Sequence, residues 1–411
     1  MAGINQFTSN FLESSSQGNV DIGTKYVTKS YLIDTYPYLT GLGNIRFAGL
    51  FSTGGNNNGQ LCDGTSTDRS SPVQTIAGGT TWKQVATSFA GTTAAIKTDG
   101  TLWTCGYNAD GELGDNTIVS KSSPVQVVGN ATTWKQVDTG RFHTTAIKTD
   151  GTLWIWGYNL YGQLGDSTLV LKSSPVQTIA SGTTWKQVAG GQWHTSAIKT
   201  DGTLWSWGNG GYGQLGDSNL LTIRSSPVQT IALGNNWKQV SCGGFHTAAI
   251  KNDGTLWAWG QDSFGQCGNT VRITRRSSPI QTSATGTNWK QVSCGYQFTM
   301  AIKTDGSLWS WGNNGFGQLG DSTIVHKSAP VQVIGNATNW KQVSCGKIHH
   351  AAIKTDGTLW TCGYNINGQL GDSTDIRKSS PVQTIAGGNN WKSVSAGGTY
   401  TIGITEMGDD F

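Results

Sequence analysis

A repeat of 51 or 52 residues runs through most of the chain and limits the folds that it can adopt. The tryptophan of a "WKQV" or "WKSV" segment occurs in seven places: Trp82, Trp134, Trp185, Trp237, Trp289, Trp340 and Trp391. A second tryptophan follows in each of the first six units, and "LFSTGG" places Phe51 in the seventh such slot. A fixed period of this length is typical of solenoids, propellers and other repeat arrays.

Each unit contains four short segments with strand character. These are "WKQVSCG", "HTAAIK", "TLWAWG" and "SSPVQTIA", and the Asp-Gly pair between the second and third is a strong hairpin signal. The proline of the fourth segment suits an edge position, because its nitrogen cannot donate to a neighbouring strand. Small sheets that are apolar on both faces stack radially, so the expected fold is all-β, a seven-bladed β-propeller.

The two ends of the chain each supply half a unit. Residues 391–408 contain only first and second strands, whereas residues 45–79 contain only third and fourth strands. We therefore expect one blade to combine N- and C-terminal strands, which closes the ring and protects its strand edges. The expected organisation is an N-terminal arm, residues 1–43, and one propeller, residues 44–411.

The unit also resembles a known repeat. "LWxWGxNxxGQLGD", "SSPVQ" and "WKQVxxGxxHTxAIKTDG" are similar to the regulator of chromosome condensation repeat over about residues 44–411. The resemblance implies a seven-bladed propeller, but the family includes nucleotide exchange factors, a plant ultraviolet-B photoreceptor and a secreted β-lactamase inhibitor. The chain has no protruding insertion, only Lys25 and Lys29 in the arm, and "GRFHT", "GQWHT" and "GGFHT" where the photoreceptor has "GWRHT". None of these activities is therefore expected.

Composition argues against several classes of partner. Most of the 28 cationic residues recur at fixed positions in the units and the net charge is only +4, so we expect no nucleic-acid partner. Seven cysteines without a CxxC pair predict no disulfide framework and no metal site. Cys242, Cys294 and Cys345 share a slot for small residues near the ring axis, although a three-cysteine metal site is the alternative. Without a signal peptide or membrane-length segment, we expect cytoplasmic synthesis and no membrane insertion.

No arrangement of residues predicts catalysis or cofactor binding. His143, His194, His246 and His349 occupy one slot that other units fill with Thr92, Phe298 and Tyr400, which favours structural histidines over acid-base catalysts. Glutamate is scarce, and the aspartates fall in turns where they cap backbone groups. The chain is therefore expected not to be an enzyme.

Two classes of loop vary between units and should emerge on one face, with the uniform Asp-Gly turns on the other. Exposed aromatic and basic residues of this kind are common in protein interfaces. The candidate partner-binding residues are Arg141, Phe142, Trp193, Phe245, Tyr296 and Lys347 in the first loop class, and Tyr161, Tyr212, Phe264 and Phe316 in the second. The alternative is that these side chains only seal the ends of the blades.

The arm contains too many apolar and aromatic residues for a simple linker. Tyr26, Tyr31, Leu32, Tyr36 and Tyr38 are candidate assembly residues, unless this strip packs on its own propeller. We expect a non-enzymatic recognition propeller in a bacteriophage virion, as a tail, fibre or decoration protein. It would be made in the host cytoplasm, contact other virion subunits through the arm, and bind a protein or host-surface ligand. The alternative is a cytoplasmic regulator of a small GTPase or another enzyme.

Overall fold

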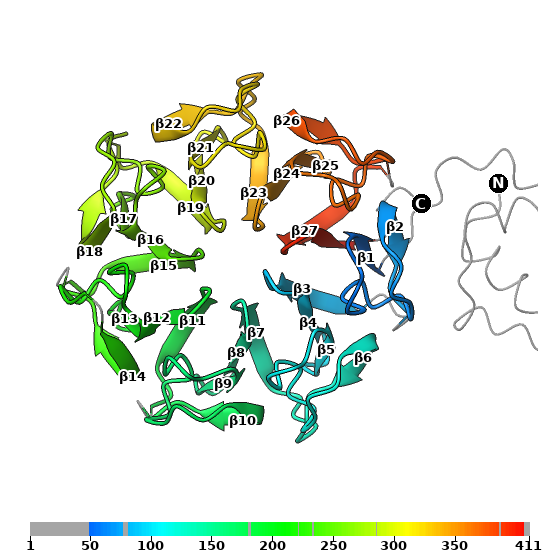
Figure 1. Cartoon of the computed structure of the whole chain (residues 1–411), viewed down its shortest axis with the longest axis vertical. Helices are drawn as coiled ribbons and strands as arrows, with labels where there is room; N and C mark the ends of the chain where they lie inside the picture. The colour runs from blue at the N-terminus through cyan, green and yellow to red at the C-terminus, as the bar shows by residue number, and fades with distance from the viewer. Residues whose placement is uncertain are drawn as a thin grey trace, which may run out of the picture.

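The protein forms a ring of small β-sheets around a central axis (Figure 1). The computed structural model describes residues 49–76, 81–179, 182–220, 222–231, 234–284, 286–385 and 388–406. These residues form 28 strands in seven four-stranded sheets, which confirms the expected all-β seven-bladed propeller. Within these ranges there is no helix long and apolar enough to cross a membrane. The proposed arm, with Tyr26, Tyr31, Leu32, Tyr36 and Tyr38, lies outside the described residues.

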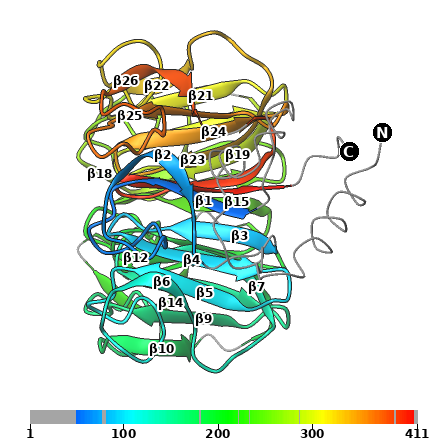
Figure 2. The ribbon, with the colours of Figure 1, turned by 90° about the vertical axis from the view of Figure 1, so that its right-hand side faces the viewer.

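Each blade places its four strands in order from the ring axis outward (Figure 1), and Figure 2 shows the ring from its side. The first strands are β3 Trp82–Thr87, β7 Trp134–Thr139, β11 Trp185–Gly190, β15 Trp237–Cys242, β19 Trp289–Cys294, β23 Trp340–Cys345 and β27 Trp391–Ala396. The second strands are β4 Thr92–Lys97, β8 His143–Lys148, β12 His194–Lys199, β16 His246–Lys251, β20 Phe298–Lys303, β24 His349–Lys354 and β28 Tyr400–Thr405.

The third and fourth strands form the outer half of each blade. The third strands are β5 Leu102–Gly106, β9 Leu153–Gly157, β13 Leu204–Asn209, β17 Leu256–Gln261, β21 Leu308–Gly312, β25 Leu359–Gly363 and β1 Gly49–Gly54. The fourth are β6 Lys121–Gln126, β10 Lys172–Gln177, β14 Ile223–Gln229, β18 Arg275–Gln281, β22 Lys327–Gln332, β26 Lys378–Gln383 and β2 Arg69–Gln74. The proline-containing strands lie at the outer edge of each sheet, where a missing N–H donor is tolerated.

One blade is built from both ends of the chain, as the half-units predict. Its strand order is β2-β1-β28-β27. β1 and β28 pair antiparallel from Gly49 opposite Thr405 to Gly54 opposite Tyr400. Gly49 and Thr405 lie at the blade end that corresponds to the Asp-Gly turns of the other units. Both ends of the described chain therefore leave the ring on the face of those turns.

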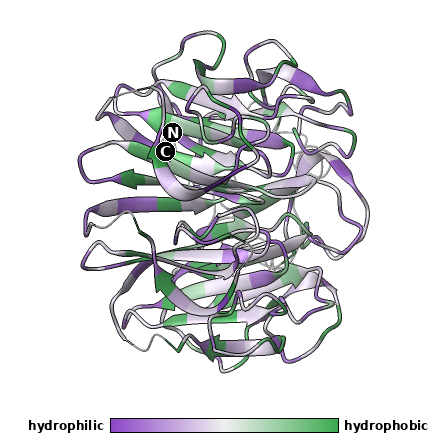
Figure 3. Cartoon of the chain, turned by 60° about the vertical axis from the view of Figure 1, so that its left-hand side comes forward, coloured by the Kyte–Doolittle hydropathy of each residue, from purple (hydrophilic) through white to green (hydrophobic). Residues whose placement is uncertain are grey.

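The hydrophobic core is divided among the contacts between neighbouring blades. In one such contact, Ala248 and Ile250 of one blade pack with Trp289, Ala301 and Trp311 of the next, and all of these side chains are buried. Hydrophobic segments recur along the strands of successive blades (Figure 3). Each sheet is covered on both faces, which explains why its strands carry apolar residues on both sides.

A glutamine on each of six inner strands ties that strand to the next blade. Gln84 Nε2 donates to Val137 O at 2.9 Å, and Val137 N donates to Gln84 Oε1 at 3.1 Å. The same two bonds join the pairs Gln136–Val188, Gln187–Val240, Gln239–Val292, Gln291–Val343 and Gln342–Val394. We call each such pair of bonds a glutamine clasp. The seventh inner strand, β27, carries Ser393 in this slot.

The repeated histidines also lie between blades. His143 Nε2 is 2.9 Å from Thr195 Oγ1 of the next blade, and the pairs His194–Thr247, His246–Thr299 and His349–Thr401 are at 3.0, 2.9 and 3.0 Å. Burial lowers the pKa of each of these four histidines to about 3. They are neutral parts of the packing, in agreement with the structural role inferred from their slot.

The expectation that no cysteines pair is wrong in one case. Cys62, between β1 and β2, forms a disulfide with Cys105 of β5, 43 residues further along the chain, with a Cα–Cα distance of 5.9 Å. The odd number of cysteines gave no sign of this pair. Its two cysteines also belong to different blades, so comparison of the units could not bring them together. Cys242, Cys294 and Cys345 are buried at the ends of inner strands, as their small-residue slot indicates. Among the described residues, no group of three His, Cys, Asp or Glu side chains could hold a metal ion.

Candidate protein-interaction face

The two variable loop classes meet at one end of each blade. Tyr158 N, at the start of a third-to-fourth connection, donates to Phe142 O in a first-to-second connection at 2.8 Å. We call this end of the ring the variable face and the opposite end the Asp-Gly face. Nine of the ten candidate residues are half-buried, and Phe316 is the most exposed at 36 %.

One group of aromatic side chains surrounds Trp193. The ring centroids of Phe142, Tyr158 and Tyr161 lie 5.1, 5.3 and 5.2 Å from that of Trp193. The Arg141 guanidinium lies 4.6 Å from the ring centroid of Phe142 and 5.8 Å from that of Trp193. This Trp193 cluster combines a large apolar area with a cation held against aromatic rings.

A second group surrounds Tyr296. The Phe245 ring lies 5.8 Å from Tyr296 and 5.0 Å from Tyr212, and Lys347 Nζ lies 5.8 Å from the Tyr296 ring. Phe89 contacts Tyr296 at 6.1 Å, although their blades lie on opposite sides of the axis (Figure 1). The Tyr296 cluster therefore reaches across the axis of the ring.

Gln192 joins the two clusters. Its side chain is almost completely buried, with 4 % exposed. With the amide oriented to satisfy its neighbours, Nε2 donates to Tyr296 Oη at 3.1 Å and Oε1 accepts from Arg141 Nη1 at 2.9 Å. Eight of the candidate residues thus belong to one continuous surface: Arg141, Phe142, Tyr161, Trp193, Tyr212, Phe245, Tyr296 and Lys347.

The other two candidates lie apart from this surface. Phe264 packs on His326 and Phe316 packs on Tyr364, in each case with ring centroids 5.0 Å apart. Four residues of this surface were not predicted from the sequence: Phe89, Gln192, Tyr158 and Tyr107, whose ring centroid lies 6.0 Å from that of Phe142. Tyrosine directly before the third-to-fourth connection in several units was a signal for the last two, and Phe89 falls in the same loop class as Phe142.

The charge of this surface is mainly positive. Within the described part of the chain, neither Arg141 nor Lys347 forms a salt bridge with a carboxylate. Burial raises the pKa of Glu112 to about 8, and it also raises the pKa of Asp110. Glu112 is therefore largely protonated near neutral pH and carries little charge that could offset that of Arg141 or Lys347.

The Asp-Gly face differs because its polar groups are satisfied within each unit. Lys97 Nζ lies 5.1 Å from the Trp82 ring and 4.5 Å from the Trp103 ring. Asp99 Oδ1 accepts from Thr101 N at 2.9 Å, and Trp103 Nε1 donates to Thr101 Oγ1 at 2.9 Å. The lysine–tryptophan contacts recur in five further blades.

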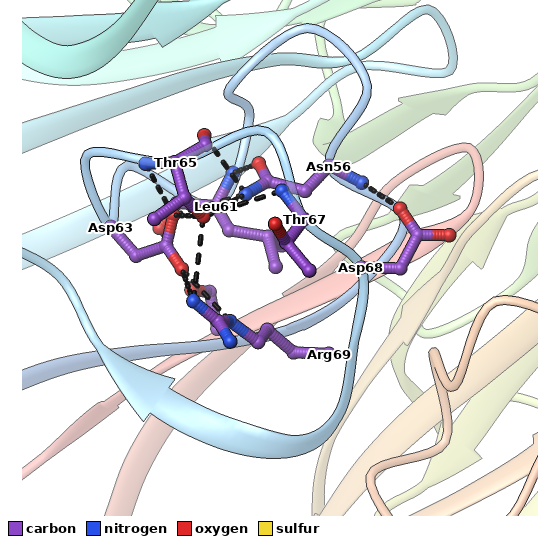
Figure 4. Close-up of polar contacts among 8 residues, drawn as sticks. Asn56, Leu61, Asp63, Thr65, Thr67, Asp68 and Arg69 are labelled. Atoms are coloured by element: carbon purple, nitrogen blue, oxygen red, sulfur yellow. Dashed lines mark hydrogen bonds and ion pairs between the residues drawn. The ribbon is translucent and has the colours of Figure 1, made fainter.

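The repeated cations next to the fourth strands also have structural partners (Figure 4). Arg69 Nε donates to Asp63 Oδ2 at 3.0 Å, and Asn56 Nδ2 donates to Asp63 Oδ1 at 3.0 Å. Corresponding salt bridges join Arg224 to Asp217 and Lys327 to Asp321. These cations hold their own loops together.

Comparison with known proteins supports this architecture. Residues 49–408 match the RCC1-like domain. The chain is 32 % identical to the ultraviolet-B receptor UVR8 of Arabidopsis thaliana over 337 residues, which are 80 % of this chain and 76 % of the receptor. It is 28 % identical to human E3 ubiquitin-protein ligase HERC2 over 86 % of this chain but only 8 % of the ligase.

Solved structures show the same fold. Prp20p from Saccharomyces cerevisiae, solved in a study of its binding to Gsp1p and histones, has a TM-score of 0.78 and 18 % identity over 89 % of this chain and 93 % of Prp20p. Human WBSCR16 has a TM-score of 0.78 and 22 % identity over 88 % of this chain and 99 % of its own. The match to the family and the relationship to the plant receptor together show that this chain belongs to the RCC1-like domain family.

Proposed function

We propose that the variable face is a non-enzymatic recognition surface for an acidic protein segment that also carries apolar side chains. The observation that carries this proposal is the pair of unmatched cations, Arg141 and Lys347, within a continuous aromatic surface. Aromatic rings supply contact area at low conformational cost, and a desolvated arginine favours carboxylate partners. Binding of proteins by the related fold of yeast Prp20, solved bound to Kap60, supports protein recognition over catalysis.

We further propose that the propeller works in a virus particle, where the arm docks it and the variable face contacts a protein or host-surface ligand. Two observations support this placement. β1 begins at Gly49 on the Asp-Gly face, so the N-terminal segment joins the propeller at the end opposite the variable face. The Cys62–Cys105 disulfide also suits a protein that works outside the reducing cytoplasm in which it is made.

The recognition proposal is tested by cross-linking the protein to its target and measuring the affinity of the purified target for variants. Trp193→Ala with Phe245→Ala and Tyr296→Ala should weaken binding at least about tenfold, because aromatic anchors dominate such interfaces. Arg141→Gln with Lys347→Gln should weaken binding and reduce its dependence on salt. Lys83→Gln with Lys135→Gln, exposed lysines of inner strands outside both clusters, is the matched control.

The measured affinities show whether the partner binds the variable face or another part of the molecule. Unchanged affinity in the triple aromatic variant would show that partner binding lies elsewhere. Particle incorporation is tested separately, by comparing the full chain with a protein that starts at Gly43. The shorter protein should remain folded and monomeric but fail to enter particles, and equal incorporation of both proteins would remove the role proposed for the arm.

A further inference from the structure

One contact between blades differs from the others in its chemistry. This closing interface lies between the sheet β2-β1-β28-β27 and the sheet β3-β4-β5-β6 (Figure 1). At four of the other interfaces, a glycine of one blade lies against a tryptophan of the next, and a Cβ on Gly114 would be 2.6 Å from Trp156 Nε1. The same pairing joins Gly165 to Trp207, Gly216 to Trp259 and Gly268 to Trp311.

At the closing interface, both members of this pair are replaced. Cys62 stands in the glycine slot and Cys105 in the tryptophan slot, and the two form the disulfide. Cys62 keeps the left-handed backbone of the slot, with φ of 57°, close to the 66° of Gly114. That conformation is unfavourable for any residue with a Cβ. The paired replacement and the retained strain indicate that the bond between the side chains has a role of its own.

The closing interface also lacks the glutamine clasp found at the other six. Ser393 occupies the glutamine slot, and within the described residues its buried Oγ has no hydrogen-bond partner. Tyr400 replaces the histidine of the other units and donates to Thr92 O at 2.6 Å. The disulfide therefore lies at the interface where one of the repeated non-covalent links is missing.

The disulfide anchors the β1–β2 hairpin, which is half of a blade. Cys62 belongs to the connection of the β1–β2 hairpin, and a two-stranded hairpin is marginally stable alone. The inner partner of this hairpin, β28, comes from the far end of the chain. The bond to Cys105 instead anchors the hairpin to the blade that follows it directly in sequence.

We propose that the Cys62–Cys105 disulfide is the covalent link that holds the ring closed. It fixes the β1–β2 hairpin against β5, so that the edge of β1 is in place when β28 pairs with it. The disulfide limits the separation of β1 from β28 and therefore limits opening of the ring at the blade made from both ends of the described chain.

The repeat itself supplies a matched control. Cys62→Gly with Cys105→Trp installs the glycine–tryptophan pair of four other interfaces without a disulfide. The tryptophan would lie over the glycine at position 62, as Trp156 lies over Gly114, and a small cavity lined by residues including Leu50, Trp82 and Trp103 lies beside the pair. Cys62→Ser with Cys105→Ser removes the bond without replacement, and Cys362→Ser changes a cysteine in the same third-strand slot of another blade.

The experiment is hydrogen exchange of the β1 and β28 amides, with thermal melting. In the double serine variant these amides should exchange at least tenfold faster, while amides of β15 to β18 keep their rates, and the melting midpoint should fall by about 5 °C. The glycine–tryptophan variant and Cys362→Ser should both behave like the unmodified protein. If the double serine variant fails to fold, the same exchange is measured on folded, unmodified protein before and after reduction.

Two results would overturn the proposal. One is exchange of β1 and β28 that is the same with and without the disulfide. The other is alkylation of Cys62 and Cys105 in unmodified protein that has been denatured without a reductant, because free thiols at both positions mean that the disulfide has not formed.

Discussion

Glu112 occupies a slot that is glutamine in the other six units: Gln60, Gln163, Gln214, Gln266, Gln318 and Gln369. Its side chain is 1 % exposed, and Oε2 accepts a hydrogen bond from Asp110 N at 2.9 Å. Oε1 has no partner among the described residues. A buried carboxyl with this surrounding is stable only when protonated, in which form it has the shape of the glutamine that it replaces.

Glu112→Gln should stabilise the fold most at alkaline pH. The folded pKa of Glu112 is raised to about 8, mainly by burial, whereas its unfolded value is about 4.3. The unfolded chain therefore loses this proton first, and stability falls as pH rises from about 4.3 to about 8, by at most about 1.4 kcal/mol per pH unit. Urea unfolding at pH 5 and pH 8 should show a larger gain at pH 8.

The reverse change at an equivalent position is the control. Gln163→Glu places a carboxyl in the same buried slot of the next blade and should lower stability more at pH 8 than at pH 5. A gain from Glu112→Gln that is equal at both pH values would mean that ionisation of Glu112 is not its cause.

Thr270 is a second residue whose slot conflicts with its side chain. Its φ is 73°, in the left-handed region, where the equivalent Gly64 has φ of 78°. β-branched residues rarely adopt this conformation. Thr270→Gly should raise the free energy of unfolding by up to about 1 kcal/mol, because relief of strain exceeds the entropy lost by glycine. Thermal melting measures the gain, and Gly64→Thr should lower the midpoint. A Thr270→Gly protein that melts earlier would show that the Thr270 side chain contributes more than its strain costs.

At the scale of the element, the third-to-fourth connections show how one polar network tolerates exchange of its members. Five of the seven connections have asparagine first and aspartate seven residues later, as in Asn108 and Asp115. In the connection before β18 the order is reversed to Asp262 and Asn269. Arg276 donates to both, with Nε 2.8 Å from Asp262 Oδ2 and Nη2 3.0 Å from Asn269 Oδ1.

Asp262→Asn alone should destabilise the protein by about 3 kcal/mol, because the Arg276 side chain is only 13 % exposed and would lose its carboxylate. Adding Asn269→Asp restores the order of the five other connections and should recover most of this loss, since Arg224 pairs with Asp217, the aspartate at the position of Asn269. Chemical denaturation of the two single variants and the double variant measures the coupling. Additive effects would show that the two positions do not share the arginine.

The strands themselves were predictable from sequence. Period, Asp-Gly turns and the proline position gave the four strands of each unit and their order, because these signals lie within one unit. The glutamine clasps and the Asp63 network were not anticipated. Glutamine in "WKQV" looks like an ordinary exposed strand residue, and only the neighbouring blade explains its position.

At the scale of the whole molecule, four of the seven interfaces contain a buried neutral histidine in one repeated slot, and His350 lies buried at a fifth, 2.8 Å from Gln318 O. The folded pKa values of the four histidines in the repeated slot, about 3, lie below the unfolded value of about 6.5. The unfolded chain therefore binds protons that the folded ring excludes, so stability is complete above about pH 6.5 and is lost as pH falls towards 3. Each histidine contributes at most about 1.4 kcal/mol per pH unit.

The melting midpoint should therefore fall steeply between pH 6 and pH 4. His246→Phe should make this fall shallower, since Phe298 already occupies the same slot in the next blade and is buried. Thr299 retains its bond to Gln266 O at 2.9 Å in that variant. A midpoint that depends on pH in the same way with and without His246 would exclude this histidine as a source of acid sensitivity.

Closure of the ring was predictable because the half-units at the two ends are complementary. The disulfide and the Phe89–Tyr296 contact were not, since both join residues of different blades and depend on loop geometry that no repeat comparison supplies. The role of the candidate residues in partner binding remains a prediction, made from the variation of their loops between units. The structure adds their grouping into one surface around Trp193 and Tyr296, without Phe264 and Phe316.

The pairing of β1 with β28 also has a mechanical consequence. A load applied through the N-terminal segment enters at Gly49, while a ligand held on the variable face pulls from the opposite end of the same blades. The tension then runs along β1, perpendicular to its hydrogen bonds with β28. The bonds from Gly49–Thr405 to Gly54–Tyr400 are loaded together in shear and cannot be opened one at a time from an end. A ring closed in this way should resist traction far better than one closed by a strand that is peeled from its edge.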